Sequence, residues 1–283
     1  SNRLTLNLGI RYEVETPMTE RFDRLVAGFA FEEANPIEQQ ARTNYARSPI
    51  PELPVSAFRV LGGQRFLNQA GVGRSPFRVE KNNIMPRIGF AYQLTSKTTL
   101  RGGYGVYYDS LGVNAQVALQ TGFSQSTPIQ ASLDSGVTYI ASNANPFPNG
   151  LLPPAGPSKG LLTNLGQALN YYWGNLTHPY SQRWSFGFQR LLPESFLLDA
   201  SYVANRGTRL PATRSLNNTP AQYLSTLPVR DNATINYLSA SFPSPFRGID
   251  PIYGANISRG SLLRPYPHLG NVTSEEPIGY SWY

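Results

Sequence analysis

The chain has no cysteine among its 283 residues. This absence excludes a disulfide framework and any metal site built on thiolates. Histidine is almost absent as well, and His178 and His268 both lie next to proline in long connecting segments. A catalytic triad or a zinc site needs partner residues around its histidine, and neither motif is present. We therefore expect two ordinary surface histidines, no enzymatic activity and no cofactor or metal.

Long hydrophobic runs are also missing. No stretch approaches the roughly 20 apolar residues that a transmembrane helix requires. Lysine is scarce, because Lys81, Lys97 and Lys159 are the only lysines among 24 basic residues and the other 24 − 3 = 21 are arginines. These arginines are scattered singly, often beside acids, and do not cluster on one element with stacking aromatics. The net charge of +7 therefore does not indicate a nucleic-acid partner.

What the chain does have is a two-residue alternation of apolar and polar residues. In "PRIGFAYQLTSKTTLRGGYGVYYD", Ile88, Phe90 and Tyr92 share one parity, and the pattern resumes after Thr95-Ser96-Lys97. Alternation on both sides of a short polar turn predicts a β-hairpin. The same pattern predicts six strands, near 3–15, 86–94, 98–108, 182–191, 196–205 and 278–283.

The connections between these strands alternate strictly between short and long. The long ones, 17–83, 110–179 and 208–276, have 67, 70 and 69 residues, and they contain 21 of the 24 prolines. Proline cannot donate a hydrogen bond to a strand ladder, so this distribution is typical of loops. In an up-and-down sheet, all three long loops then lie at one end. The sequence thus predicts an antiparallel sheet with three large loops.

Short helices are expected inside the loops. Asn35-Pro36 with Glu38 resembles a helix start, as does Thr219-Pro220. The leucines at 161, 162, 165 and 169 also have helical spacing. We expect these segments to pack each loop onto itself.

A soluble sandwich and a membrane barrel both have strands that are apolar on one side. A sandwich places about seven strands in roughly 100 residues, whereas this chain spreads six over 283. Loops of this length are uncommon in compact domains, while outer-membrane barrels combine short periplasmic turns with long extracellular loops. We therefore predict an all-β fold, an antiparallel up-and-down transmembrane β-barrel in the outer membrane of a Gram-negative bacterium, in contact with its lipid.

The distribution of side chains between the two strand faces agrees with a barrel. Four arginines fall on the polar parity, where a lumen would be: Arg11, Arg87, Arg101 and Arg183. Six aromatics on the apolar parity are candidates for the membrane interface: Tyr12, Tyr92, Tyr104, Tyr108, Trp184 and Tyr202. Arg190 is an exception on the apolar parity, next to a turn. Gly102 is also on the outer parity, where a neighbouring aromatic could cover it.

Six strands in a line leave two open edges, which lipid does not tolerate. The first strand begins within three residues of the start, and the last pattern stops at Tyr283. We therefore expect residues 1–283 to be a slice through a larger barrel domain.

Six segments spread along the chain share a resemblance to one family. They are "NNIMPRIGFAYQLTSKTTLRGGYGVYYD", "RLTLNLGIRYE", "LLDASYVANRGTRLP", "PAQYLSTLPVRD", "LLRPYPHLG" and the closing "GYSWY". These segments resemble the TonB-dependent outer-membrane receptors of the Oar-like group abundant in Acidobacteria. The resemblance implies a barrel of about 22 strands, filled by an N-terminal plug domain and powered through the TonB complex. Both partners would be contacted through other parts of the protein.

Three functions remain open at this point. The first is TonB-dependent uptake of an unidentified small molecule, peptide or glycan, captured by the loops and passed along a polar lumen. The inward arginines would then bind the ligand or form salt bridges to the plug or to lumen acids. The second is a non-transporting surface barrel that displays its loops for adhesion. The third is a secreted carbohydrate-binding module, with Tyr171-Tyr172-Trp173 as a sugar-stacking platform.

Overall fold

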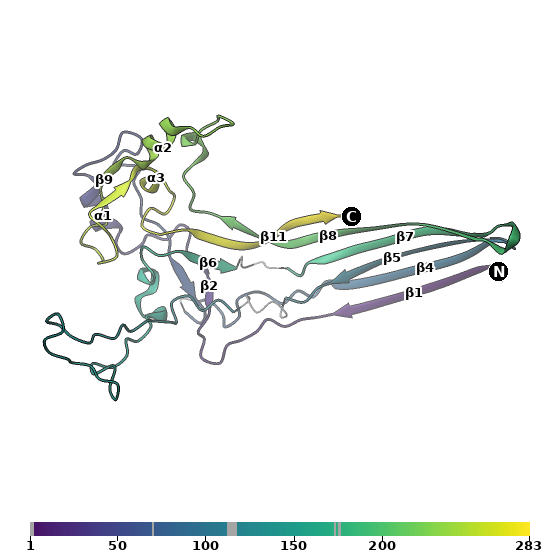
Figure 1. The fold of residues 1–283 in the computed structure, drawn as a ribbon, viewed down its shortest axis with the longest axis horizontal. Coiled ribbons are helices and arrows are strands. Elements are labelled where there is room, and N and C mark those ends of the chain that lie inside the picture. The colour runs from purple at the N-terminus through teal and green to yellow at the C-terminus, as the bar shows by residue number, and fades with distance from the viewer. Residues whose placement is uncertain (1–2, 70, 112–117, 173, 175–176) are drawn as a thin grey trace.

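The computed structural model describes residues 3–69, 71–111, 118–172, 174 and 177–283. Its main element is a seven-stranded sheet in the order β1-β4-β5-β7-β8-β11-β6 (Figure 1). The strands are β1 (Leu4–Glu13), β4 (Asn83–Thr95), β5 (Thr98–Tyr108), β6 (Leu169–Tyr172), β7 (Tyr180–Leu191), β8 (Leu197–Ser215) and β11 (Val272–Trp282). All neighbours are antiparallel except the short β6, which was not predicted and pairs in parallel with β11. The sheet is open, with β1 at one edge.

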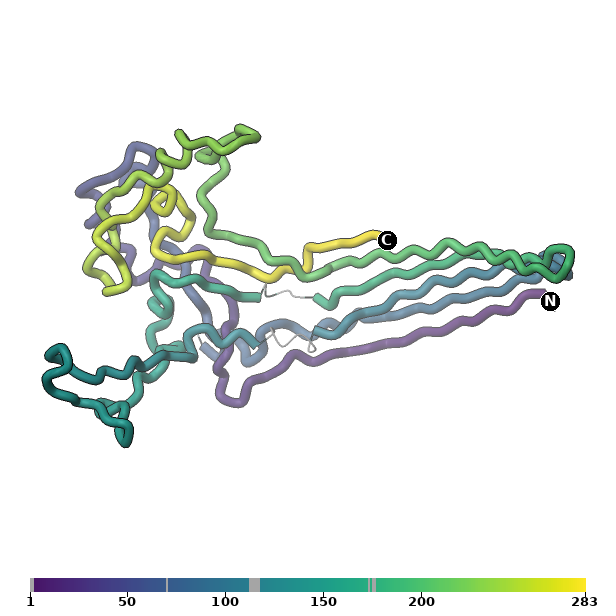
Figure 2. The backbone as a smooth tube through the Cα atoms, viewed as in Figure 1, coloured from purple at the N-terminus to yellow at the C-terminus, as the bar shows by residue number. Residues whose placement is uncertain are grey.

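The short turns and the long connections lie at opposite ends of the sheet, as predicted. The β4–β5 turn and the β7–β8 turn, which contains the single 3-10 turn η3 (Pro193–Ser195), lie together at one end of the sheet (Figure 2). The three long connections lie at the other end. We call their described residues, within 14–82, 109–179 and 216–271, the loop cap.

Two strands are longer than the alternation predicted. β8 continues to Ser215 instead of ending near 205, and β11 begins at Val272, inside the predicted loop 208–276. Their extensions pair with one another from Thr273 opposite Ser215 to Glu276 opposite Ala212. This part of the ladder lies beside the loop cap and carries polar residues on both faces. The apolar alternation used for prediction is therefore missing there.

The loop cap contains short elements of its own. They are β2 (Val26–Phe29), α1 (Glu38–Tyr45), β3 (Gln64–Phe66), the 3-10 segments η2 (Gly156–Leu162) and η4 (Ala221–Tyr223), α2 (Asn232–Ser239), β9 (Ser241–Pro243), β10 (Asn256–Ser258) and α3 (Arg259–Leu262). β2 pairs with β3, and β9 pairs with β10. No helix in the described part of the chain is long and apolar enough to cross a membrane.

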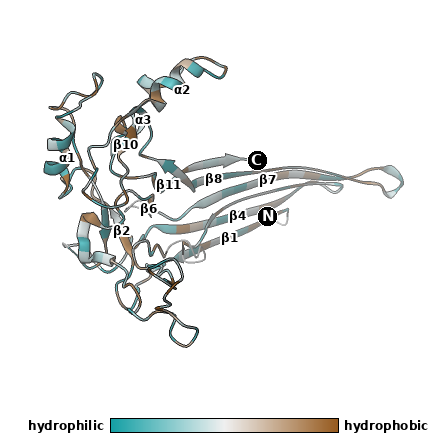
Figure 3. Cartoon of the chain, turned by 60° about the vertical axis from the view of Figure 1, so that its left-hand side comes forward, coloured by the Kyte–Doolittle hydropathy of each residue, from teal (hydrophilic) through white to brown (hydrophobic). Residues whose placement is uncertain are grey.

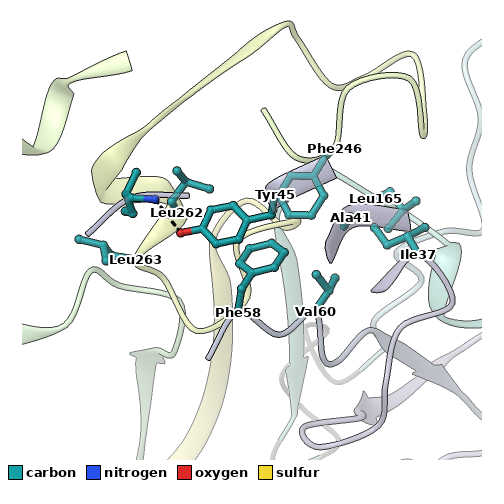
Figure 4. Close-up of a cluster of buried hydrophobic side chains, with 10 residues drawn as sticks. Ile37, Ala41, Tyr45, Phe58, Val60, Leu165, Phe246, Leu262 and Leu263 are labelled. Carbon is teal, nitrogen blue, oxygen red and sulfur yellow. Dashed lines mark hydrogen bonds between the residues drawn. The ribbon is translucent and has the colours of Figure 1, made fainter. Parts of the chain in front are cut away.

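The main hydrophobic core lies in the loop cap and joins all three long connections. Tyr45 and Phe58 of the first connection stack with ring centroids 4.2 Å apart (Figure 4). Leu165 of the second connection and Phe246 of the third complete the same cluster. Figure 3 shows hydrophobic segments in the loop cap as well as along the strands. The expectation that each loop packs onto itself was therefore wrong, because buried residues of all three connections share one cluster.

Hydrogen bonds also cross between the connections. The Asn35 side chain is buried and donates to the backbone oxygens of Gly62 and Leu161, at 2.9 and 3.0 Å. Asn44 donates to the Pro245 oxygen at 3.0 Å. The predicted helix after Asn35-Pro36 is confirmed as α1, whereas Thr219-Pro220 precedes only the single turn η4.

The leucines at 161–169 do not form the helix that their spacing suggested. Gly160 and Asn164 both have positive φ values, 53° and 61°, and such residues interrupt a right-handed helix. Leu165 instead joins the main core, and Leu169 joins a second cluster with Val26 and Val272. Their spacing therefore reflects contacts with two different cores.

The prediction that a neighbouring aromatic covers Gly102 is confirmed. Gly102 of β5 is paired with Phe90 of β4, and a Cβ atom at Gly102 would lie 2.3 Å from Phe90 Cε1. The Phe90 ring therefore occupies the space of the missing side chain. At the next residue, Gly103, the nearest atom to such a Cβ is 3.5 Å away.

We predict that Gly102→Ala lowers the stability of the sheet by about 1–3 kcal/mol, because it overpacks this site and displaces the ring. Gly103→Ala is the matched control and has room for its methyl group. The measurement is the temperature at which the protein, in outer membranes, loses its heat-modifiable mobility on an SDS gel. Equal transition temperatures for the two variants would contradict the cover by Phe90.

The second histidine is in the loop-cap core. His268 is only 1% exposed and packs beside Phe246, and neither ring nitrogen has a hydrogen-bond partner of normal geometry. Burial lowers the pKa of His268 to about 4, and the backbone of Gly62 opposes this only in part. The expectation of a surface residue was wrong, because a proline-rich connection here forms the interior of a folded unit.

We predict that the loop cap loses stability as the pH falls from about 6.5 to about 4. In this range the unfolded imidazole takes up a proton that buried His268 does not. The stabilisation is complete above pH 6.5, and its loss can reach about 3 kcal/mol. Hydrogen exchange of the core amides, corrected for intrinsic rates, should show weaker protection at pH 5 than at pH 7. The difference should shrink in His268→Phe.

Candidate functional site

The strand register separates the sheet into two chemically different faces. One cross-strand row contains Leu6, Phe90, Gly102, Phe186 and Tyr202. A row of the opposite parity contains Gly9, Arg87, Gly105, Arg183 and Asn205. Because successive side chains along a strand point to opposite faces, the first row lies on an apolar face and the second on a polar face.

Two of the predicted arginines meet on the polar face. Arg87 of β4 and Arg183 of β7 flank Gly105 of β5. The Tyr107 ring leans back over Gly105, where a Cβ atom would lie 2.8 Å from its hydroxyl oxygen. The guanidinium carbons of Arg87 and Arg183 lie 4.9 and 5.3 Å from the centre of this ring. One tyrosine therefore holds two arginines from different strands through cation–π contacts.

These two arginines border a shallow hollow of about 550 Å³. Gly89, Gly103 and Ser185 also line it, so small residues leave it open. Among the described residues, no salt bridge involves Arg87, Arg101 or Arg183. The hollow thus carries positive charge that acids in the described part of the chain do not neutralise.

The other two predicted arginines lie apart from this pair. Arg101 pairs with Ala91 and Gly187, four residues along β5 from Gly105 and nearer the short turns. Arg11 lies on the edge strand β1 and forms a salt bridge with Glu13. Tyr107 was missed by sequence reasoning. The available signal was its position, as an aromatic on the polar parity of the hairpin.

The six predicted interface aromatics lie at several levels of the apolar face. Tyr12 and Tyr108 lie toward the loop cap, and Tyr92 lies toward the short turns, opposite Leu4 and Leu100. The other three, Tyr104, Trp184 and Tyr202, lie between these levels. Two of the tyrosine hydroxyls donate hydrogen bonds, from Tyr12 to the Lys81 backbone oxygen and from Tyr104 to Gln182 Oε1, each at 3.1 Å.

The apolar face is not covered by any described part of the chain. Leu8 and Ile10 of β1 are 69% and 77% exposed. β1 has 10 residues, within the roughly 9–11 that a tilted transmembrane strand requires. Arg206 is a second arginine on this parity, besides Arg190, and its guanidinium lies 4.6 Å from the Trp282 ring centre. A broad apolar face of this length, opposite a polar one, is typical of strands that separate lipid from a lumen.

A comparison with protein families agrees with this geometry. The family described as outer membrane beta barrel domain matches residues 1–283. The chain belongs to this family. A search of curated proteins found no match, and neither did a search of solved structures. The protein is thus an outer-membrane barrel protein of a Gram-negative bacterium, and its sheet is barrel wall.

A second cluster lies where the barrel wall meets the loop cap. His178, just before β7, is 4% exposed, and each of its ring nitrogens faces a carboxylate. Nδ1 lies 3.1 Å from Glu80 Oε2, and Nε2 lies 3.0 Å from Glu15 Oε2. Arg209 of β8 donates to Glu80 Oε1 at 2.8 Å. Ser110, after β5, donates to Glu15 at 2.9 Å.

This cluster joins the ends of β1, β4, β5 and β7 to Arg209 inside β8. Glu15 and Glu80 thus share one imidazole ring, which each contacts through a different nitrogen. Burial by itself raises the pKa of Glu80, but the His178 backbone N–H, the His178 ring and Arg209 outweigh it and hold the pKa below its ordinary value. The expectation that His178 is a surface residue was wrong. Sequence reasoning missed this network, whose members are far apart in the chain.

Two other predicted features are placed by the structure. Tyr171 is 3% exposed and stacks with Phe29 at a centroid distance of 5.9 Å, so its face is not free for a sugar. Burial raises the pKa of Tyr171 and of Tyr172 to about 12. Trp173 lies outside the described residues. Among the described residues, no group of three or more His, Cys, Asp or Glu side chains could hold a metal ion.

We predict that His178→Phe loosens the loop cap from the barrel wall, because Glu15 and Glu80 then lose a shared partner. The expected loss of protection is on the order of 2 kcal/mol. Hydrogen exchange should rise in residues 15–24 and 76–80 and stay unchanged in the strand centres. Arg65→Gln, which breaks an exposed pair with Glu33, should cost less than about 1 kcal/mol. Equal losses of protection in the two variants would contradict the role of the His178 cluster in attaching the loop cap to the barrel wall.

Proposed function

We propose that this barrel wall belongs to a TonB-dependent outer-membrane receptor. In this proposal the loop cap faces the outside and captures a ligand, which then passes through a lumen lined by the polar face. A plug domain and the TonB complex are the proposed partners, in addition to outer-membrane lipid. The resemblance of several segments to the Oar-like receptors supports the same assignment.

The observation that carries the proposal is the arrangement of Arg87, Tyr107 and Arg183. Two guanidinium groups without an acidic partner in the described chain are held side by side on the lumen face, above a hollow lined by glycine and serine. A barrel wall that only supports loops has no need for such a site. A lumen that receives an anionic solute, or the acidic side chains of a plug, does.

A surface barrel for adhesion is the second candidate. Between Asp109 and Lys159 the only charged residue is Asp134, and several large apolar side chains of this segment are exposed, including Leu133 and Val137 at 78% and 82%. Exposed apolar surface of this kind marks contact sites. The third candidate, a soluble carbohydrate-binding module, has no support in an outer-membrane barrel domain whose Tyr171 is buried.

The two remaining candidates differ in whether the lumen responds to TonB. Ser185 lines the hollow between Arg183 and Gly187 on the polar face. Residues 1–283 contain no cysteine, so Ser185→Cys introduces the only thiol of this part of the barrel wall and loop cap. For a TonB-dependent receptor, we expect a membrane-impermeant maleimide to label this thiol at a different rate in cells with TonB than in cells without it. A change of at least threefold is the expected result.

The control is Thr226→Cys, at an exposed position of the loop cap, whose labelling should be the same in both strains. If the Ser185→Cys rate were equally independent of TonB, the transport proposal would fail. Adhesion would then be the better account. Its test is to compare the aggregation of cells that carry the intact protein with that of cells whose protein lacks residues 124–154.

A further inference from the structure

A second hollow, of about 350 Å³, lies in the loop cap, between the first and second long connections. β3 and residues 33–36 form one side, and η2 forms the other. It is separate from the barrel lumen and from the His178 cluster. Its volume is within the range of small-molecule sites.

The walls of this hollow are fixed by hydrogen bonds between the two connections. Asn35 joins Gly62 to Leu161, as described above. Gln64 is 2% exposed; its Nε2 donates to the Thr121 oxygen at 2.7 Å, and its Oε1 accepts from Asn164 at 3.0 Å. Because buried side chains make these contacts, the hollow is formed before any ligand arrives.

The lining combines an apolar floor with a charged rim. Phe66, Val72, Leu161 and Pro157 provide apolar surface. At Gly160, nothing lies within 4 Å of the position that a Cβ atom would occupy, so the backbone itself borders open space. A small apolar or aromatic group fits these walls better than a sugar, which would need polar partners on every side.

The rim has one unmatched charge. Arg65 and Glu33 neutralise one another at 2.7 Å. Lys159 also lines the hollow, and no hydrogen bond or ion pair of Lys159 occurs within the described ranges. It is the only Lys or Arg in the whole of 110–179. The net charge at the rim is therefore +1, which favours an anion.

We infer that this hollow binds a small organic monoanion, whose apolar body packs on Phe66, Val72 and Leu161 and whose negative group pairs with Lys159. As a capture step, this site rests on the proposed receptor function. Binding of the anion does not require transport, and the test below measures binding to the isolated protein without uptake. Failure of one proposal is thus distinguishable from failure of the other.

The test uses 4-fluorophenylacetate and its neutral analogue 4-fluorophenylacetamide, titrated into the whole protein in detergent and followed by 19F NMR. We expect saturable binding of the anion, at least tenfold tighter than that of the amide. Lys159→Gln should remove this preference. Lys97→Gln, in the short β4–β5 turn, should keep it. Val72→Phe, which fills part of the floor, should lower the affinity of both compounds at least fivefold.

Three results would overturn the inference. The first is that the anion shows no saturable binding up to about 10 mM. The second is equal affinity for the anion and the amide. The third is that Lys159→Gln leaves the preference for the anion unchanged. Because Lys159 is exposed, its substitution should leave folding intact. The far-UV circular dichroism spectrum of each variant checks this.

Discussion

The structure depends on the fact that no described residue covers the apolar face of its main sheet. In lipid, every backbone polar group must be paired within the protein, and apolar side chains need no further burial. β4, β5 and β7 are paired on both sides and satisfy the first condition, and the exposed apolar residues of β1 satisfy the second. Lipid thus takes the place of a core, which leaves the opposite face free to be polar.

The same constraint explains why the hydrophobic cores lie in the loop cap. Outside the lipid the chain must bury apolar groups in the ordinary way, and three connections of about 70 residues can do so only together. The cap then needs a fixed attachment to the wall. The His178 cluster supplies it, because Glu15 and Glu80 lie next to the ends of β1 and β4 and Arg209 lies within β8. The hollow beside Lys159 has rigid walls because the cap is one folded unit.

Sequence reasoning could predict those features that repeat along the chain. Alternation located β1, β4, β5, β7 and the first half of β8, because each repeats its contact with lipid every second residue. It failed beyond Asn205 of β8, where the strand continues to Ser215 with polar residues on both faces. It also failed for Leu165 and Leu169, since partners from other connections determined their spacing. His178 and His268 were misjudged for the same reason: burial by distant segments leaves no local pattern.

The stretch "GGYG" shows how closely the two faces are coupled. Gly102 points to the lipid side and is covered by Phe90, whereas Gly105 points to the lumen side and is covered by Tyr107. Gly103, between them, lines the hollow, and Tyr104 returns to the lipid side. A side chain at Gly105 would displace Tyr107, and with it the ring that holds Arg87 and Arg183. The glycine-rich sequence could also suggest a phosphate-binding loop. Such a loop needs a helix after its glycines, but the residues here continue as strand. Glycine is required in this stretch because an aromatic ring from each face occupies the volume of a missing side chain, and the positive site in the lumen depends on one of those rings.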